Sequence, residues 1–198
     1  MHYALDRTSL TPEGNIVRYQ IDTRSSTFKV RAFATGLLSA FGHSPTVAIR
    51  DFSGEVKFDP ETLSSGSTLV RIKATSLKVA DDIGDKDRQD IERQMYETVL
   101  EVSQYPEIVY ECQNVTINRS TNGQLEATLL GKLTLHGVTQ DQAVSARISV
   151  IGDSLRATGD FSVSQSAFGI KEVTAVGGTI RLKDELKATF EMVARKSV

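Results

Sequence analysis

The chain has few of the residues that form cross-links, metal centres or catalytic motifs. Its 198 residues include one cysteine, Cys112, which excludes an intrachain disulfide and a metal cluster of several thiolates. The three histidines are His2, His43 and His136, and none forms a His-x-x-x-His pair. A metal site would require His43 and His136 to meet in space, and we expect none. The Gly-x-Ser-x-Gly and phosphate-loop motifs are also absent, so no cofactor is expected.

The chain also lacks an excess of one charge and any long apolar run. Its net charge of -2 leaves no basic stripe for nucleic acid. No stretch approaches the roughly 20 apolar residues of a membrane-spanning helix. Residues 1–7 have neither the basic region nor the apolar core of a signal peptide. We therefore expect a soluble protein that is cytoplasmic as given, and periplasmic only if its N-terminus has been trimmed.

What the chain has instead is a regular alternation of apolar and polar residues. Over residues 125–135 nearly every second residue is apolar, which is typical of a strand with one buried face. Gly137 interrupts the run, and the alternation resumes over 144–150, which predicts an antiparallel pair. Further strands are predicted at 19–22, 28–34, 47–58, 70–75, 108–117, 155–163 and 186–194. About eight strands with little helix favour an all-β antiparallel barrel or sandwich, forming one domain over 1–198 with a loosely ordered segment at 1–16.

One segment has the period of a helix. Between residues 82 and 104 the apolar positions Ile91, Met95 and Val99 recur every four residues, and acidic residues crowd the first turns. Pro106 disfavours helical geometry in the residue before it, so the helix is predicted to end by residue 104. An amphipathic helix of this kind packs on the barrel or covers its mouth.

The predicted inward faces carry many small residues. They are Ala32, Ala34, Ala74, Ala127, Ala146, Ala157, Gly159 and Ala188. An eight-stranded barrel is just wide enough to be filled by side chains or to hold one small ligand. Small residues therefore indicate either a cavity or a taper in which Phe28, Phe161 and Phe190 fill the space opposite them.

Several motifs in fixed order give the chain a family resemblance. They are Tyr19-Gln20-Ile21-Asp22 with Ser25, Phe52-Ser53-Gly54 with Phe58-Asp59, Tyr105-Pro106-Glu107-Ile108, the segment from Gly131 to Thr139 that reads Gly-Lys-Leu-Thr-Leu-His-Gly-Val-Thr, and Phe168-Gly169-Ile170. The chain resembles the YceI-like family, and the matching features span residues 19–193. The resemblance implies an extended lipocalin-like barrel that binds a long isoprenoid lipid, polyprenyl or quinone-like, for carriage, storage or protection.

We expect a non-enzymatic protein whose lipid lies inside the barrel. The predicted cavity residues are Phe28, Val30, Ala32, Leu37, Leu38, Phe41, Val70, Ile72, Leu129, Ile148, Phe161 and Phe190, and His43 and Arg50 are candidate contacts for a headgroup. Two alternatives stay open. One is an enzyme acting on a small hydrophobic substrate with His43 or His136 as general base. The other is a protein-interaction module with a filled barrel and an exposed apolar patch. A homodimer is also open.

Overall fold

The structure is a computed structural model that describes residues 15–35, 44–61, 66–119, 124–175 and 180–197. Its strands are β1 (Val17–Ile21), β2 (Thr27–Arg31), β3 (Ala34–Thr35), β4 (Thr46–Ile49), β5 (Phe52–Phe58), β6 (Gly66–Lys73), β7 (Leu77–Val79), β8 (Glu107–Arg119), β9 (Leu125–Leu135), β10 (Val138–Ile151), β11 (Ser154–Ser164), β12 (Thr174–Ala175), β13 (Ile180–Leu182) and β14 (Glu185–Lys196). The helical segments are the α-helix α1 (Asp85–Gln94), a π-helical turn (Met95–Val99) and two 3₁₀ turns, η1 (Ala74–Ser76) and η3 (Ser166–Phe168).

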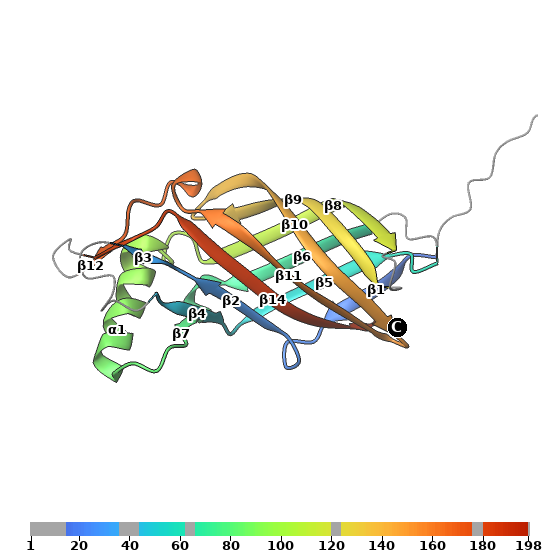
Figure 1. The fold of residues 1–198 in the computed structure, drawn as a ribbon, viewed down its shortest axis with the longest axis horizontal. Helices are drawn as coiled ribbons and strands as arrows, with labels where there is room; N and C mark the ends of the chain where they lie inside the picture. The colour runs from blue at the N-terminus through green and yellow to red at the C-terminus, as the bar shows by residue number, and fades with distance from the viewer. Residues whose placement is uncertain (1–14, 36–43, 62–65, 120–123, 176–179, 198) are drawn as a thin grey trace, which may run out of the picture.

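Eight antiparallel strands close into a barrel. Their order is β1-β5-β6-β8-β9-β10-β11-β14, and pairing of β14 back onto β1 completes the ring. The barrel is elongated, with α1 at one end and the C-terminus at the other (Figure 1). The predicted all-β antiparallel barrel of about eight strands with one helix is therefore confirmed, and a barrel rather than a sandwich is formed.

Beside β14, the wall is built from three pairs of strand segments, and a bend separates the two segments of each pair. The pairs are β1 with β2, β5 with β4, and β6 with β7. β14 pairs with β1 near its C-terminal end, at Ala194–Lys196, and with β2 nearer its start, at Lys187–Glu191. In the same way, β5 pairs with β1 and β4 pairs with β2. On their far side, β6 pairs with β5 and β7 pairs with β4. Each bend separates two strand segments that continue along the same neighbours. The sequence predicted residues 47–58 as one strand, but the structure breaks it at Arg50 and Asp51.

The first bend explains the motif around Asp22. The Asp22 carboxylate accepts hydrogen bonds from Ser25 Oγ at 3.0 Å and Arg195 Nε at 2.9 Å. These bonds, that from Arg195 first, hold the pKa of Asp22 below its usual value. The buried Ser26 hydroxyl meets the backbone of Val193, accepting from its N–H at 2.9 Å. The turn between β1 and β2 is thus fastened to β14 by side chains where strand pairing is interrupted.

The Gly-Lys-Leu-Thr-Leu-His-Gly-Val-Thr segment forms the β9–β10 hairpin. Leu135 pairs with Val138 across a two-residue turn in which both His136 and Gly137 have positive φ, 51° and 73°. Two successive positive φ values are the signature of the turn that suits the twist of a hairpin. The His136 ring lies against Tyr105, with ring centroids 4.6 Å apart. The motif is therefore a structural hairpin that packs on the segment before β8.

The α1 end of the barrel is completed by side chains instead of by a further strand. Among the described residues, β7 pairs only with β4. On the other edge of β7, Val79 N–H donates to Glu92 Oε1 at 3.0 Å, and the Leu77 carbonyl accepts from the Tyr96 hydroxyl. The helix thus occupies the side of β7 where a strand would otherwise lie.

The helical segment is shorter than its sequence pattern predicts. The prediction was 82–104, whereas α1 covers Asp85–Gln94 and the π-helical turn ends at Val99. Glu101 takes a positive φ of 45°, which stops helical geometry before Pro106 is reached. A second, three-stranded sheet, β12-β13-β3, was not predicted, and its β3 and β12 lie at the same end of the barrel as α1 (Figure 1).

Two hairpin glycines test whether the β9–β10 turn depends on tight packing as well as on backbone geometry. Gly152 has φ +56° with open space around an added Cβ, whereas a Cβ on Gly137 (φ +73°) would lie 2.5 Å from Tyr105 Cε1. Gly152→Ala should lower the free energy of unfolding by about 1–2 kcal/mol through backbone strain alone. Gly137→Ala should lower it by a further ~1–3 kcal/mol of overpacking, measured by urea denaturation. Equal losses in the two variants would show that Tyr105 does not constrain the turn.

Candidate ligand-binding cavity

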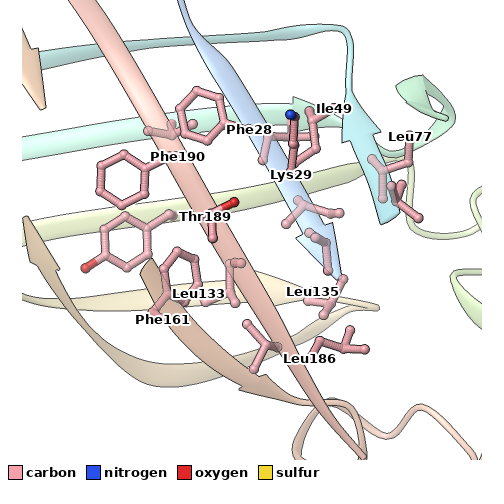
Figure 2. Close-up of a pocket in the computed structure, with 18 of the residues that line it drawn as sticks. Phe28, Lys29, Ile49, Leu77, Leu133, Leu135, Phe161, Leu186, Thr189 and Phe190 are labelled. Carbon is pink, nitrogen blue, oxygen red and sulfur yellow. The ribbon is translucent and has the colours of Figure 1, made fainter. Parts of the chain in front are cut away.

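The barrel encloses a cavity of about 1020 Å³. Aliphatic and aromatic side chains from opposite walls point into it, among them Phe28, Ile49, Leu77, Leu133, Phe161, Leu186 and Phe190 (Figure 2). Its size lies at the upper end of the range of ligand-binding pockets, about 300–1,000 Å³. The filled interior expected for an interaction module is therefore absent from the part of the chain that the structure describes.

Both predicted roles of the small inward residues are present. Ala32, Ala146, Ala157 and Ala188 line the cavity. At Gly159, in contrast, an added Cβ would lie 2.7 Å from the Phe190 ring, so this phenylalanine fills the space opposite a small residue. Small residues thus create the cavity in some places and accommodate aromatic rings in others. Ala127 is buried in the core and is not among the cavity-lining residues.

Tyr110 places a polar hydroxyl in the apolar wall of the cavity. Its hydroxyl lies 3.2 Å from the Gln142 carbonyl and 3.4 Å from the Leu129 carbonyl, so it donates to the wall. Burial raises the pKa of Tyr110 well above its usual value and keeps the hydroxyl neutral. The ring passes over Gly131, where a Cβ would lie only 2.6 Å from it. The first glycine of the hairpin motif therefore makes room for this tyrosine.

The cavity reaches the surface beside α1. Its lining there includes exposed side chains of the helix and the π-helical turn, such as Ile91 and Glu97, together with Pro45 and Ile83. No residue of α1 is buried. Besides its contacts to β7, the helical segment is held by a hydrogen bond of 3.1 Å from Gln94 to the Thr174 carbonyl. The π-helical turn packs Met95, Tyr96 and Val99 against the apolar cluster that includes Leu77 and Leu133. The helical segment thus covers the mouth with an exposed α-helical part and a π-helical part that packs on the core.

The structure places most of the predicted site residues around this space. Nine of them line the cavity: Phe28, Val30, Ala32, Val70, Ile72, Leu129, Ile148, Phe161 and Phe190. Leu37, Leu38, Phe41 and His43 lie outside the described residues. Arg50 is exposed at the bend between β4 and β5 and does not line the cavity, so its predicted headgroup contact has no support in this geometry. Contact of the lining residues with a lipid stays a prediction.

Other lining residues were not selected from the sequence. Val144, Leu155 and Met192 belong to strands whose alternation was recognised, so their inward orientation could have been inferred from the same pattern. The charged residues at the mouth, including Asp81 and Glu97, lie outside the alternating strands, so the sequence pattern did not indicate that they line the cavity. They reach the cavity because α1 lies across the end of the barrel, which depends on the tertiary arrangement.

His136 is placed to hold the fold together. One ring nitrogen lies 2.6 Å from Glu101 Oε2 and the other 3.2 Å from the Phe168 carbonyl oxygen. Both nitrogens are thus engaged, and His136 is not among the residues that line the cavity. The alternative in which His136 acts as general base in the cavity does not fit this position. Within the described ranges, no group of three or more histidine, cysteine or acidic residues could hold a metal ion.

Fold and cavity together define the class: a closed antiparallel barrel with an apolar interior that opens at one end. The sequence model of the YceI-like domain family matches residues 19–194, and the chain belongs to this family. Among solved structures, BcnA from Burkholderia cenocepacia shares 20% identity, with 87% of this chain and 98% of that chain covered and a TM-score of 0.66.

Two further structures have the same fold. A polyisoprenoid-binding domain from Saccharophagus degradans, implicated in plant cell wall breakdown, is 10% identical, covering 91% of this chain and 99% of that chain at a TM-score of 0.65. The YceI protein of Campylobacter jejuni is 16% identical, covering 77% and 84% at a TM-score of 0.55. No curated protein matches this chain. Within the described residues, no helix has the length and apolar character needed to cross a membrane.

Substitution of Met95 tests whether α1 and the π-helical turn after it cover the mouth of the cavity. Met95 lines the cavity, whereas Gln89 is exposed on α1 and does not. Met95→Asp places a carboxylate against apolar walls, at a cost of several kcal/mol unless the helix moves outward. Release of a fluorescent apolar probe, followed by stopped flow, should become at least about tenfold faster, because 1.4 kcal/mol already corresponds to tenfold. Gln89→Asp adds the same group on the outside and should leave release unchanged. Equal rates in both variants would contradict a cover at this position.

Proposed function

We propose that the protein binds one long isoprenoid lipid, polyprenyl or quinone-like, with its tail inside the barrel and its headgroup at the mouth beside α1. The observation that carries the proposal is the apolar cavity of about 1020 Å³ that ends at a surface opening. Membership of the YceI-like family and the fold shared with a polyisoprenoid-binding domain support the choice of an isoprenoid. The lipid would be carried, stored or protected.

Burial of the tail would supply the affinity. Each buried CH₂ group contributes about 0.8 kcal/mol, less the cost of ordering a flexible chain. Buried polar groups of the lining are directed to the backbone: the Tyr110 hydroxyl, the Thr68 hydroxyl and the Gln165 amide each donate to main-chain carbonyls. A site of this kind tolerates variation along the tail and leaves recognition of the headgroup to the mouth.

Non-enzymatic binding fits the cavity better than catalysis. A general base must lie within hydrogen-bonding reach of its substrate. The histidine–carboxylate pair of the described residues, His136 and Glu101, joins a hairpin to the segment after α1 and lies outside the cavity lining. We therefore propose that the protein acts without a catalytic residue and without a cofactor other than its lipid.

Extraction of the purified protein tests the ligand directly. Protein prepared without detergent should release an isoprenoid lipid into organic solvent, detected by mass spectrometry. Ala146→Trp should abolish its recovery, because Ala146 lines the cavity and a large ring fills it. The adjacent Ser145 is exposed on the other face of β10, so Ser145→Trp should retain the lipid.

Lipid recovery can be interpreted only for variants that are folded. A folded, lipid-free Ala146→Trp beside a loaded Ser145→Trp supports the proposal, with folding followed by circular dichroism. Should Ala146→Trp unfold, the smaller Ala146→Phe is measured in its place. Equal lipid recovery from the folded cavity variant and its control would contradict a tail bound in the barrel.

A further inference from the structure

The mouth of the cavity carries an excess of negative charge. Four carboxylates belong to the lining at this end and are called the mouth acids: Asp81, Asp87, Asp90 and Glu97. Arg93 is the one cation that lines the cavity from α1, so the four carboxylates and one guanidinium sum to a charge of -3. Any headgroup left at the mouth by a buried tail would lie within this field.

Three cations near the mouth are engaged with neighbouring groups, whereas Lys86, exposed on α1, forms no ion pair among the described residues and does not line the cavity. Arg93 pairs with Asp90 at 2.6 Å. Arg88 is directed to Asp85 and to the carbonyls of the loop before α1. Lys78 pairs with Glu92 at 2.8 Å. Asp87 and Glu97, in contrast, are exposed and form no ion pair among the residues that the structure describes. The charge that faces an approaching headgroup is therefore that of unneutralised carboxylates.

Two further basic residues line the cavity, and neither belongs to α1 or to the segments that flank it. Lys57 lies near the far end of β5 and pairs with Glu55 at 2.7 Å. Lys29 is exposed on β2, opposite Ala48 of β4. Among the described residues that line the cavity from α1 and its flanking segments, a phosphate would meet four carboxylates and one arginine already paired with Asp90, in place of the unpaired basic side chains that usually receive it.

We infer that the cavity selects its lipid by headgroup charge: it takes isoprenoids with an uncharged or cationic headgroup and discriminates against those that end in phosphate or diphosphate. This inference rests on the proposed function. Burial of the tail is common to all these lipids, so the difference between them arises at the mouth. There the mouth acids repel an anion and attract a cation through partly screened Coulomb interactions.

The test uses three probes with one tail: geranylgeraniol, geranylgeranylamine and geranylgeranyl monophosphate. Each displaces a fluorescent apolar dye from the full chain at low ionic strength, below its own aggregation concentration. The phosphate should bind at least about tenfold more weakly than the alcohol, as expected for several unit charges within roughly 10 Å. The amine should bind as tightly as the alcohol or more tightly. The gap should shrink as salt shortens the screening length.

Charge reversal assigns the effect to the mouth. Asp87→Lys with Glu97→Lys should bind the phosphate at least as tightly as the alcohol. A matched control with the same change in net charge, Asp153→Lys with Glu191→Lys, alters exposed carboxylates away from the mouth and should behave as the wild type. If the lysine pair does not fold, Asp87→Asn with Glu97→Gln should still narrow the gap.

The outcomes separate this inference from the proposal beneath it. Equal binding of alcohol and phosphate by the wild type, or equal effects of the two charge-reversed variants, would overturn selection by charge while leaving lipid binding intact. Failure of the uncharged alcohol to displace the dye would overturn the proposed function itself.

Discussion

Closure of the β-ladder between β1 and β14 is the constraint on which the rest of the molecule depends. Three residue pairs, from Tyr19 with Lys196 to Ile21 with Ala194, join the first strand to the last. A closed ring has no free edge, so its backbone groups are satisfied within the wall. The inward side chains form one apolar cluster drawn from strands all round the ring, and they still leave a cavity of about 1020 Å³. Backbone pairing around the closed ring and this cluster together hold the wall around that space.

The closure also explains why the strands bend. β14 has to pair with β1 at one end and with β2 along the rest of its length, so the turn between β1 and β2 cannot separate them widely. Asp22 and Ser26 provide the hydrogen bonds that the interrupted ladder loses. Residues of the first family motif are therefore needed for the course of the barrel wall, and not for contact with a ligand.

Alternation of apolar residues predicted the barrel because it reports directly on which face of a strand is buried. Residues 125–135 illustrate this, since Leu129 and Leu133 line the cavity as their spacing requires. The same signal cannot locate a bend such as that at Arg50, whose neighbours continue the pattern on both sides. Nor can it find β3, β12 or β13, which are too short to show a period.

The mouth was less predictable than the wall for a related reason. The helical spacing of Ile91 and Met95 indicates that one face of the helix is covered. It does not indicate which part of the protein covers that face. Only the tertiary arrangement brings Glu92 to the edge of β7 and Glu97 to the rim of the cavity. His136 lies in the turn that the interruption at Gly137 predicts, whereas its partners, Glu101 and Phe168, are distant in sequence and could not be inferred from it.

Attachment of α1 to β7 through side chains has a consequence for how long a guest would stay. The hydrogen bonds at this edge, from Val79 N–H to Glu92 and from Tyr96 to the Leu77 carbonyl, can break without the loss of any strand-to-strand backbone bond of the barrel. Residence time would then be governed by a local opening, whose free energy is separate from that of global unfolding. A substitution that raises the melting temperature by strengthening the wall would leave retention unaltered, whereas one at the β7 edge would alter retention at nearly constant melting temperature. Thermostability and retention of a bound guest would thus be independently adjustable in this barrel.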